Sequence, residues 1–249
     1  MSTVIVIPAR MDSKRFRGKP LVNIAGKTMI KRMINIAKMS SVGPVVVACC
    51  EKEVEKEALD SGAETVMTDK KLPSGSDRTF AAVKHIEMKN NKLFDIIINL
   101  QCDIPFLPYS YIQILNAKMK SKNSEIATLA AEIKSNKEIN NPNIVKVVFS
   151  NHLAQANRAL YFSRTAIPYG KGPIYHHIGI YAYKRSSLET FVNLKPSTLE
   201  AREKLEQLRA VEAGMNIDVA MVEDVPNSVD TPDDLSIILK ELEHGNFDE

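Results

Sequence analysis

The sequence opens with TVIVIPARMDSKRFRGKPL, from Thr3 to Leu21, and this stretch sets the expectation for the fold. The β-branched run Val4–Ile7 predicts a buried strand, which Pro8 interrupts. The loop that follows carries cations around Gly18, namely Arg10, Lys14, Arg15, Arg17 and Lys19. Lys and Arg suit triphosphate oxygens, and a glycine lets backbone approach a ligand closely. On clustering alone, a phosphate-binding loop and a solvated basic loop stay about equally open.

Strands and helices alternate after this loop. Apolar periodicity predicts a helix over Met29–Met39 with Thr28 as its N-cap. A strand at Val45–Cys50, a helix at Glu51–Ser61 and a strand at Ala63–Met67 follow. Such alternation is typical of parallel strands joined by right-handed crossovers, so the expected class is a doubly wound α/β sheet.

Composition limits the classes of partner. The 249 residues include 33 Lys and Arg against 30 Asp and Glu, a net charge of only +3, so no global field favours nucleic acid or a membrane surface. The three cysteines, Cys49, Cys50 and Cys102, form no CxxC pair or zinc ligand set. No targeting segment is apparent, and the apolar runs are too short to cross a bilayer. We therefore expect a soluble, cytoplasmic protein with no nucleic-acid or membrane partner.

The next segments contain candidate ligand contacts. Leu72–Arg78 is expected to interrupt the alternation of strands and helices before a helix over about Thr79–Met88. Its small hydroxyl residues suit either helix capping or ligand binding, and capping is the commoner use. The apolar strand Asp95–Leu100 leads directly to Asp103. Open α/β sheets place ligands at the carboxyl ends of their strands, so we interpret Asp103 as functional.

Antiparallel structure is expected in the second half. The predicted elements are a helix at Tyr109–Lys120, a strand at Ile126–Ile133, a hairpin formed by Val145–Phe149, a turn at Ser150–Asn151 and Leu153–Ala156, and a strand at His176–Tyr183. Adjacent His176 and His177 point to opposite faces of a strand, so they cannot both ligate one metal in regular geometry. We therefore interpret one of them as a hydrogen-bonding residue rather than either as a zinc ligand.

The C-terminal part is predicted as a helix, a strand and a second helix. Apolar residues share one face of Thr198–Glu212, and a strand follows at Asn216–Met221. The last helix is expected to run to about His244, with Thr231 as N-cap and Pro232 in its first position. Asp230 precedes that helix, so it is not needed for helix capping and stays a candidate functional residue. We expect one compact domain, residues 1–249, with a sub-domain at about 140–215.

The candidate residues suggest nucleotidyl transfer. Cations after the first strand suit a triphosphate, and Asp103 and Asp230 are hard oxygen ligands for Mg²⁺. Positioning and charge neutralisation on the leaving diphosphate would supply most of the catalysis. No GxxxxGK[ST] motif is present, which argues against an ordinary P-loop enzyme.

The sequence resembles the bacterial 3-deoxy-manno-octulosonate (Kdo) cytidylyltransferases, the CMP-Kdo synthetase family. The similarity spans nearly the whole chain in the family's order and rests on IPARMDSKRFRGKPL (Ile7–Leu21), SGSDR (Ser74–Arg78), NLQCDIP (Asn99–Pro105), NPNIVKVV (Asn141–Val148), ALYFSRTAIP (Ala159–Pro168), HHIGIYAY (His176–Tyr183), LEQLR (Leu205–Arg209) and VDTPDDL (Val229–Leu235). One such motif is weak, whereas eight in order are specific.

The resemblance implies a Rossmann-like nucleotidyltransferase fold, with a mainly parallel central sheet, helices on both faces and a smaller antiparallel dimerisation sub-domain. It also implies a homodimer that uses Mg²⁺, CTP and Kdo to make CMP-Kdo and diphosphate for lipopolysaccharide biosynthesis. The implied catalytic residues are Arg10, Lys19, Asp103 and Asp230, the last two as metal ligands. The implied CTP-binding residues are Pro8, Ala9, Arg10, Arg15, Lys19, Ser74 and Arg78. The implied sugar-binding residues are Gln101, Arg164, His177, Tyr181, Glu206 and Gln207.

The chain departs from the family pattern at three positions. Cys102 and Ile104 stand where the family usually has Gly and Glu, and Arg17 replaces the usual Pro. If the family's glycine adopts a positive φ or permits a close approach of the backbone, Cys102 at the same position would be strained or would crowd the site. Two alternatives stay open: a cytidylyltransferase for another acidic sugar, such as sialic acid, and a nucleotide-binding relative without catalysis.

Overall fold

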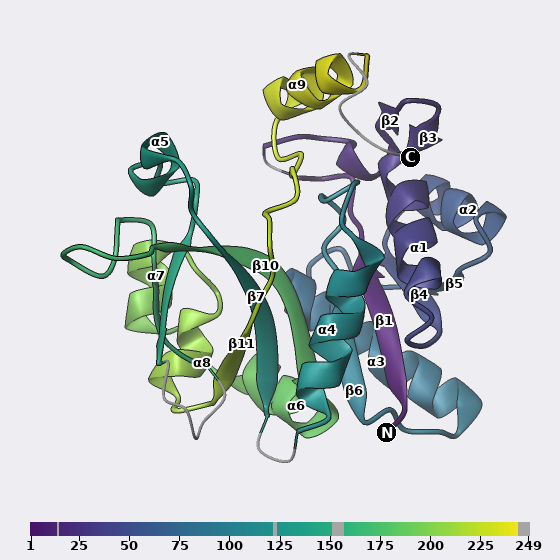
Figure 1. Cartoon of the computed structure of the whole chain (residues 1–249). Coiled ribbons are helices and arrows are strands. Elements are labelled where there is room, and N and C mark those ends of the chain that lie inside the picture. The colour runs from purple at the N-terminus through teal and green to yellow at the C-terminus, as the bar shows by residue number, and fades with distance from the viewer. Residues whose placement is uncertain (14, 122–123, 151–156, 244–249) are drawn as a thin grey trace. The chain divides into compact units, whose positions relative to one another are not determined.

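The computed structural model describes residues 1–13, 15–121, 124–150 and 157–243, and the chain divides into two compact units. The N-terminal unit comprises Ser2–Phe94, Asn99–Ile112 and Pro226–Glu249, and the central unit comprises Met1, Asp95–Ile98 and Gln113–Val225. Figure 1 labels most of their helices and strands, with colour running from purple at the N-terminus to yellow at the C-terminus. The single domain with a sub-domain at about 140–215 stays a prediction.

The N-terminal unit is built on a parallel sheet of β1 (Thr3–Pro8), β4 (Val45–Cys49) and β5 (Glu64–Met67), in the order β5-β4-β1. Side chains along β1 and β4 are buried throughout nearly their whole length, as expected for strands of a parallel sheet covered by helices. The helices α1 (Met29–Met39), α2 (Lys52–Asp60) and α3 (Gly75–Asn90) pack on these strands. The alternation predicted from the sequence is confirmed here.

Helix caps explain where two of these helices start. The Thr28 hydroxyl accepts a hydrogen bond from the Lys31 N–H at 3.3 Å, so the predicted N-cap of α1 is confirmed. Helix α3 begins at Gly75, and the prediction of a start near Thr79 is wrong. The Ser74 hydroxyl accepts from the Asp77 N–H at 3.2 Å, which allows the helix to start four residues earlier.

The loop after β1 closes on itself before a short hairpin. Gly18 has φ +80°, a conformation that favours glycine, and its N–H donates to the Met11 carbonyl at 2.8 Å. The 3-10 helix η1 (Lys19–Leu21) follows directly, and then come the paired strands β2 (Asn23–Ile24) and β3 (Lys27–Thr28). Gly18 therefore brings the cationic loop back so that η1 starts at Lys19.

Two distant segments meet beside the end of β1. The Leu100 N–H donates to the Val6 carbonyl at 2.9 Å, and the Val229 N–H donates to the Asp103 carbonyl at 2.8 Å. Helix α9 (Pro232–Glu243) follows Val229, and the Thr231 hydroxyl accepts from the Asp234 N–H at 3.2 Å as the predicted cap. The predicted end of this helix near His244 lies outside the described residues.

The central unit contains a mixed sheet in the order β6-β10-β7-β11-β9-β8. Its strands are β6 (Ile96–Asn99), β7 (Ile126–Glu132), β8 (Lys146–Ser150), β9 (Arg158–Ser163), β10 (Tyr175–Lys184) and β11 (Ile217–Met221). Strands β7 and β11 pair in parallel, and β10 pairs antiparallel with both β7 and β8. These pairings link β10, β7, β11, β9 and β8 into a closed ring, so antiparallel pairing reaches beyond the predicted hairpin.

Several expectations for the central unit need correction or qualification. The predicted helix Thr198–Glu212 is two helices, α7 (Thr198–Glu203) and α8 (Leu208–Glu212), because Lys204 adopts φ +55° and ends the first. The hairpin partner of β8 is β9, whereas Asn151 and Leu153–Ala156 lie outside the described residues. Helices α5 (Asn136–Ile139) and α6 (Arg185–Asn193) were not predicted. Helix α4 (Tyr109–Met119) matches its predicted range closely.

Membrane insertion by a helix finds no support in the part of the chain that the structure describes. None of its helices is both long enough and apolar enough to span a bilayer.

Candidate active site

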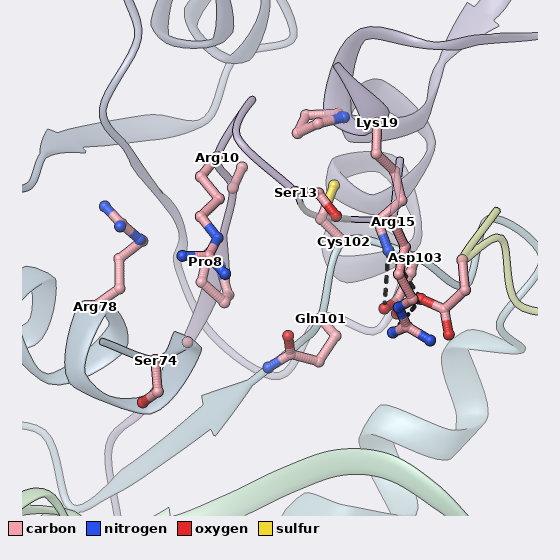
Figure 2. A pocket seen from close by; sticks show the side chains of 14 residues that line it. Pro8, Arg10, Ser13, Arg15, Lys19, Ser74, Arg78, Gln101, Cys102 and Asp103 are labelled. Atoms are coloured by element: carbon pink, nitrogen blue, oxygen red, sulfur yellow. Dashed lines mark hydrogen bonds and ion pairs between the residues drawn. The ribbon is translucent and has the colours of Figure 1, made fainter. Parts of the chain in front are cut away.

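One cavity of about 220 Å³ in the N-terminal unit gathers residues from four parts of the sequence. Its lining comprises Pro8, Ala9, Arg10, Ser13, Arg15, Lys19, Pro20, Ser74, Gly75, Arg78, Gln101, Cys102, Asp103 and Asp230. Every residue expected to bind CTP, act in catalysis or hold metal lines this cavity, together with Gln101. Figure 2 shows Arg10, Ser74 and Arg78 on one side of it and Lys19, Arg15 and Asp103 on the other.

The two carboxylates converge on one ammonium group. The Lys19 Nζ lies 3.3 Å from Asp103 Oδ2 and 3.3 Å from Asp230 Oδ1. Arg15 Nη2 donates to the same Asp230 oxygen at 3.0 Å. The hydrogen bond from Val229 to the Asp103 carbonyl explains how Asp230 reaches this place. The cations of the opening loop and the carboxylates of two later segments therefore form one cluster.

Two pKa values in this cluster are raised, each for a different reason. Burial raises the pKa of Asp103, with Asp230 adding to the shift and Lys19 opposing it. Burial by itself lowers the pKa of Lys19, but the charges of Asp103 and Asp230 outweigh it and the net shift is upward. The Lys19 shift therefore reflects its two neighbouring carboxylates, whereas the Asp103 shift reflects mainly its burial.

The opposite side of the cavity is held by close polar contacts. Arg78 is buried, and its Nη1 donates to the Thr68 hydroxyl. The Ser74 hydroxyl donates to Asp77 Oδ2 at 2.6 Å. A Cβ on Gly75 would lie 3.2 Å from the Gln101 Nε2, so glycine permits the close approach of α3 to Gln101. Ser74 thus caps the helix, and its exposure to the cavity leaves both uses suggested by the sequence in place.

Cys102 and Ile104 are buried beside Asp103. Among the described residues with positive φ, the non-glycine ones are Ala25, Ser41, Asn91 and Lys204, so Cys102 does not occupy the strained conformation considered above. Burial raises the pKa of the Cys102 thiol to about 12, with Asp103 contributing, so the thiol stays neutral. The structure therefore gives no sign of backbone strain at this departure from the family.

Four lining residues were not assigned to the site from the sequence: Ser13, Pro20, Gly75 and Cys102. Gly75 and Cys102 lie within the motifs already singled out, so their position between assigned residues was an available signal. Ser13 lies in the basic loop, where a hydroxyl among cations gives no distinct pattern. Lys14, another cation of this loop, lies outside the described residues.

His177 and Tyr181 lie on β10 of the central unit. The buried His177 Nε2 lies 3.0 Å from the Thr128 hydroxyl, and its ring packs edge-on against Phe162 and beside Tyr181. The Tyr181 hydroxyl is buried without a hydrogen-bond partner among the described residues. Burial also raises the Tyr181 pKa, with Tyr183 and Glu206 contributing, so the hydroxyl remains a proton donor. His177 is thus a hydrogen-bonding histidine, in line with the interpretation from the sequence.

Arg164 is held by backbone carbonyls of the central unit. Its Nε donates to the Glu203 carbonyl at 2.7 Å, its Nη1 to Pro142 at 2.9 Å and its Nη2 to Lys204 at 3.4 Å. A guanidinium has five N–H donors, so two remain beyond these three contacts. Glu206 and Gln207 lie in the turn between α7 and α8, where Gln207 is the buried N-cap of α8.

Within the described residues, no group of three or more His, Cys, Asp or Glu side chains could hold a metal ion on its own. A structural zinc site of that kind is therefore absent from this part of the chain. Asp103 and Asp230 are two oxygen donors, a number that leaves most of a metal's coordination sphere to other ligands.

Comparison with known proteins gives consistent matches. The cytidylyltransferase family profile matches residues 4–217. A 3-deoxy-manno-octulosonate cytidylyltransferase from Parvibaculum lavamentivorans is 48% identical over 93% of this chain and 89% of that relative. One from Paramagnetospirillum magneticum is 48% identical over 94% of this chain and 95% of that relative.

Solved structures agree with these sequence matches. The structure of a CMP:2-keto-3-deoxy-manno-octonic acid synthetase complexed with CTP has a TM-score of 0.87 at 35% identity, covering 98% of this chain and 100% of that one. A cytidylyltransferase from Leptospira borgpetersenii, at 16% identity and a TM-score of 0.65 over 100% of this chain and 89% of that one, shares the fold.

Proposed function

This chain belongs to the cytidylyltransferase family as a 3-deoxy-manno-octulosonate cytidylyltransferase, and on that premise we propose a Mg²⁺-dependent reaction of CTP with Kdo. The products are CMP-Kdo and diphosphate, and the product serves lipopolysaccharide biosynthesis. The observation that carries the proposal is the single cavity that unites three loop cations with two carboxylates. A triphosphate with a divalent ion needs both kinds of group at one place.

The donor set fits Mg²⁺. Asp103 and Asp230 present oxygens to one common cation position, which Lys19 occupies in this structure. Magnesium prefers oxygen ligands and is commonly bound by one or two carboxylates with waters and substrate phosphates. When bound by Asp103 and Asp230, Mg²⁺ supplies Lewis-acid neutralisation of phosphate charge.

The cations of the N-terminal loop bind and orient the triphosphate. Arg10 and Lys19 hold phosphate oxygens, with Arg15 beside them, and so stabilise charge that develops on the departing diphosphate. The anomeric hydroxyl of Kdo attacks the α-phosphorus, the bond from that phosphorus to the diphosphate breaks, and the hydroxyl proton is lost to solvent. Positioning of the two substrates supplies much of the rate.

Pro8, Ala9, Ser74 and Arg78 frame the cytidine in this proposal. Pro8 and Ala9 give it an apolar backing at the end of β1, and buried Arg78 offers charged N–H donors beyond its contact with Thr68. Of the five N–H donors of this guanidinium, one bonds to Thr68 and four remain for the base edge.

Gln101 in the cavity of the N-terminal unit, and separately a set of residues in the central unit, are proposed as contacts of the sugar acid. Arg164 retains two N–H donors for the carboxylate of Kdo after its three carbonyl contacts. The Tyr181 hydroxyl, buried without a partner among the described residues, needs a polar ligand group to satisfy it. His177, Glu206 and Gln207 complete the proposed set.

The finer features of fold and assembly are also proposals. We infer a Rossmann-like arrangement, a cytoplasmic location and a homodimer formed through the sub-domain at about 140–215. Leu160 and Tyr169 each expose a large apolar side chain in that range, which such a dimer contact would cover. Light scattering on the purified protein tests this, and a mass of one chain at micromolar concentration would contradict it.

Diphosphate release with CTP and Mg²⁺ tests the proposed reaction. Release with Kdo but not with N-acetylneuraminate is expected. Release with N-acetylneuraminate alone would replace Kdo by another acidic sugar. CTP binding without release from either sugar would support a relative that binds nucleotide and has lost catalysis.

A further inference from the structure

Lys19 has two incompatible tasks in the proposed reaction. In the structure its ammonium bridges Asp103 and Asp230, at 3.3 Å from an oxygen of each. The proposed function requires the same ammonium to bind phosphate and the same two carboxylates to bind Mg²⁺. A divalent cation at these carboxylates would repel the ammonium that contacts them in the structure, so the two cations compete for the position between Asp103 and Asp230. One arrangement must therefore give way to the other during the reaction cycle.

The bridging arrangement is sheltered enough to matter energetically. The Lys19 side chain is only 13% exposed, so solvent and salt screen its two ion pairs incompletely. Arg15 also pairs with Asp230, but its side chain is 65% exposed and its contribution is correspondingly smaller. Lys19 is thus the principal internal cation of this cluster among the described residues.

We propose that Lys19 is a placeholder cation that keeps Asp103 and Asp230 together until the divalent ion displaces it and frees its ammonium for the nucleotide phosphates. This inference rests on the proposed function. It makes each ligand help the other, because the metal releases the phosphate-binding ammonium, and phosphate holds that ammonium away from the carboxylates. By linkage, the nucleotide must increase metal affinity by the same factor as the metal increases nucleotide affinity.

Metal binding without nucleotide tests the placeholder directly. Free Mn²⁺ is measured by electron paramagnetic resonance during titration of the wild type and of Lys19→Met, which keeps a long side chain but removes the charge. The variant is expected to bind Mn²⁺ about tenfold more tightly, because the ion no longer displaces two partly sheltered ion pairs. Equal or weaker Mn²⁺ binding by the variant would overturn the proposal.

Arg17→Met is the matched control. Arg17 lies in the same loop, but it is 87% exposed and pairs with Asp12 at 3.8 Å. Its replacement removes the same charge without touching the cluster, and a Mn²⁺ affinity within about twofold of the wild type is expected. A tenfold gain in this control as well would assign the effect to net charge and overturn the proposal. Adding Asp230→Asn to Lys19→Met should abolish the gain, and its persistence would also overturn the proposal.

A second measurement uses the unaltered protein, in case Lys19→Met does not fold. Crystals of the wild type soaked in Mn²⁺ without nucleotide should show the ion at Asp103 and Asp230 with the Lys19 ammonium moved away from both. An ion bound to both carboxylates with Lys19 still in contact with them would refute the placeholder.

Failure of this inference is distinguishable from failure of the proposed function. The Mn²⁺ measurements contain neither CTP nor sugar, so they remain informative for a protein that releases no diphosphate. Conversely, diphosphate release from CTP and Kdo with no gain for Lys19→Met would uphold the proposed reaction and reject the placeholder.

Discussion

Acidification should destabilise the protein through His177. This side chain is only 7% exposed, its Nε2 lies 3.0 Å from the Thr128 hydroxyl, and its ring packs edge-on against Phe162. Burial, assisted by the neighbouring His176, lowers the pKa of His177 to about 3. Protonation of the folded protein would place an imidazolium among these groups without a counter-ion, so the proton binds preferentially to the unfolded chain.

The magnitude follows from the difference between the two states. A histidine in an unfolded chain has a pKa of about 6.5, and each pH unit between the two values is worth about 1.4 kcal/mol. Because the folded pKa is the lower one, the stability that neutral His177 contributes is complete above about pH 6.5 and is lost progressively toward about pH 3. At pH 5.0 the loss through His177 is about 2 kcal/mol.

Urea unfolding at pH 7.5 and pH 5.0 measures this loss in the wild type and in His177→Gln. Glutamine can still bond to the Thr128 hydroxyl but does not titrate, so the variant should lose about 2 kcal/mol less between the two pH values. Other titrating groups contribute equally to both proteins and cancel in this comparison. His85→Gln, at an exposed position of α3, is the control and should follow the wild type. An identical pH dependence in the wild type and His177→Gln would refute the reasoning.

Three further predictions concern the cavity. Asp103→Asn and Asp230→Asn should each lower kcat by about a hundredfold or more, measured as diphosphate release, and near-normal rates would contradict the metal assignment. Asp230→Asn should change the free energy of unfolding by less than about 1 kcal/mol, because the ion pairs of Asp230 are partly exposed. Burial raises the pKa of Cys102 to about 12. At pH 8 this thiol in the native protein should therefore react with iodoacetamide about a thousandfold more slowly than in urea-unfolded protein, as followed by mass spectrometry. Comparable rates would show an accessible thiolate. Gly75→Ala places a Cβ about 3.2 Å from the Gln101 amide. It should raise the KM for Kdo by up to about tenfold with little change in the KM for CTP. Unchanged kinetics would show that Gln101 moves without consequence.

Short-range patterns determined the first half of the fold. The β-branched run Val4–Ile7, the apolar spacing of Met29–Met39 and the Thr28 cap act within one strand or a few helical turns, and the structure confirms them. The same kind of pattern misplaced the start of α3, because the cap that Ser74 forms with Asp77 extends the helix beyond its apolar stripe. The apolar pattern also predicted α7 and α8 as one helix, because a continuous apolar face does not reveal that Lys204 adopts a left-handed conformation.

The sequence motifs were sufficient to name the residues that now line one cavity, but not their pairing. Lys19 is separated by 84 residues from Asp103 and by 211 from Asp230, and no local periodicity relates residues so far apart. Only the packed chain, in which Leu100 bonds to Val6 and Val229 bonds to Asp103, brings the three charges together. Local propensity thus determined the elements and the residue types, whereas long-range backbone pairing decided that one lysine lies between the two carboxylates.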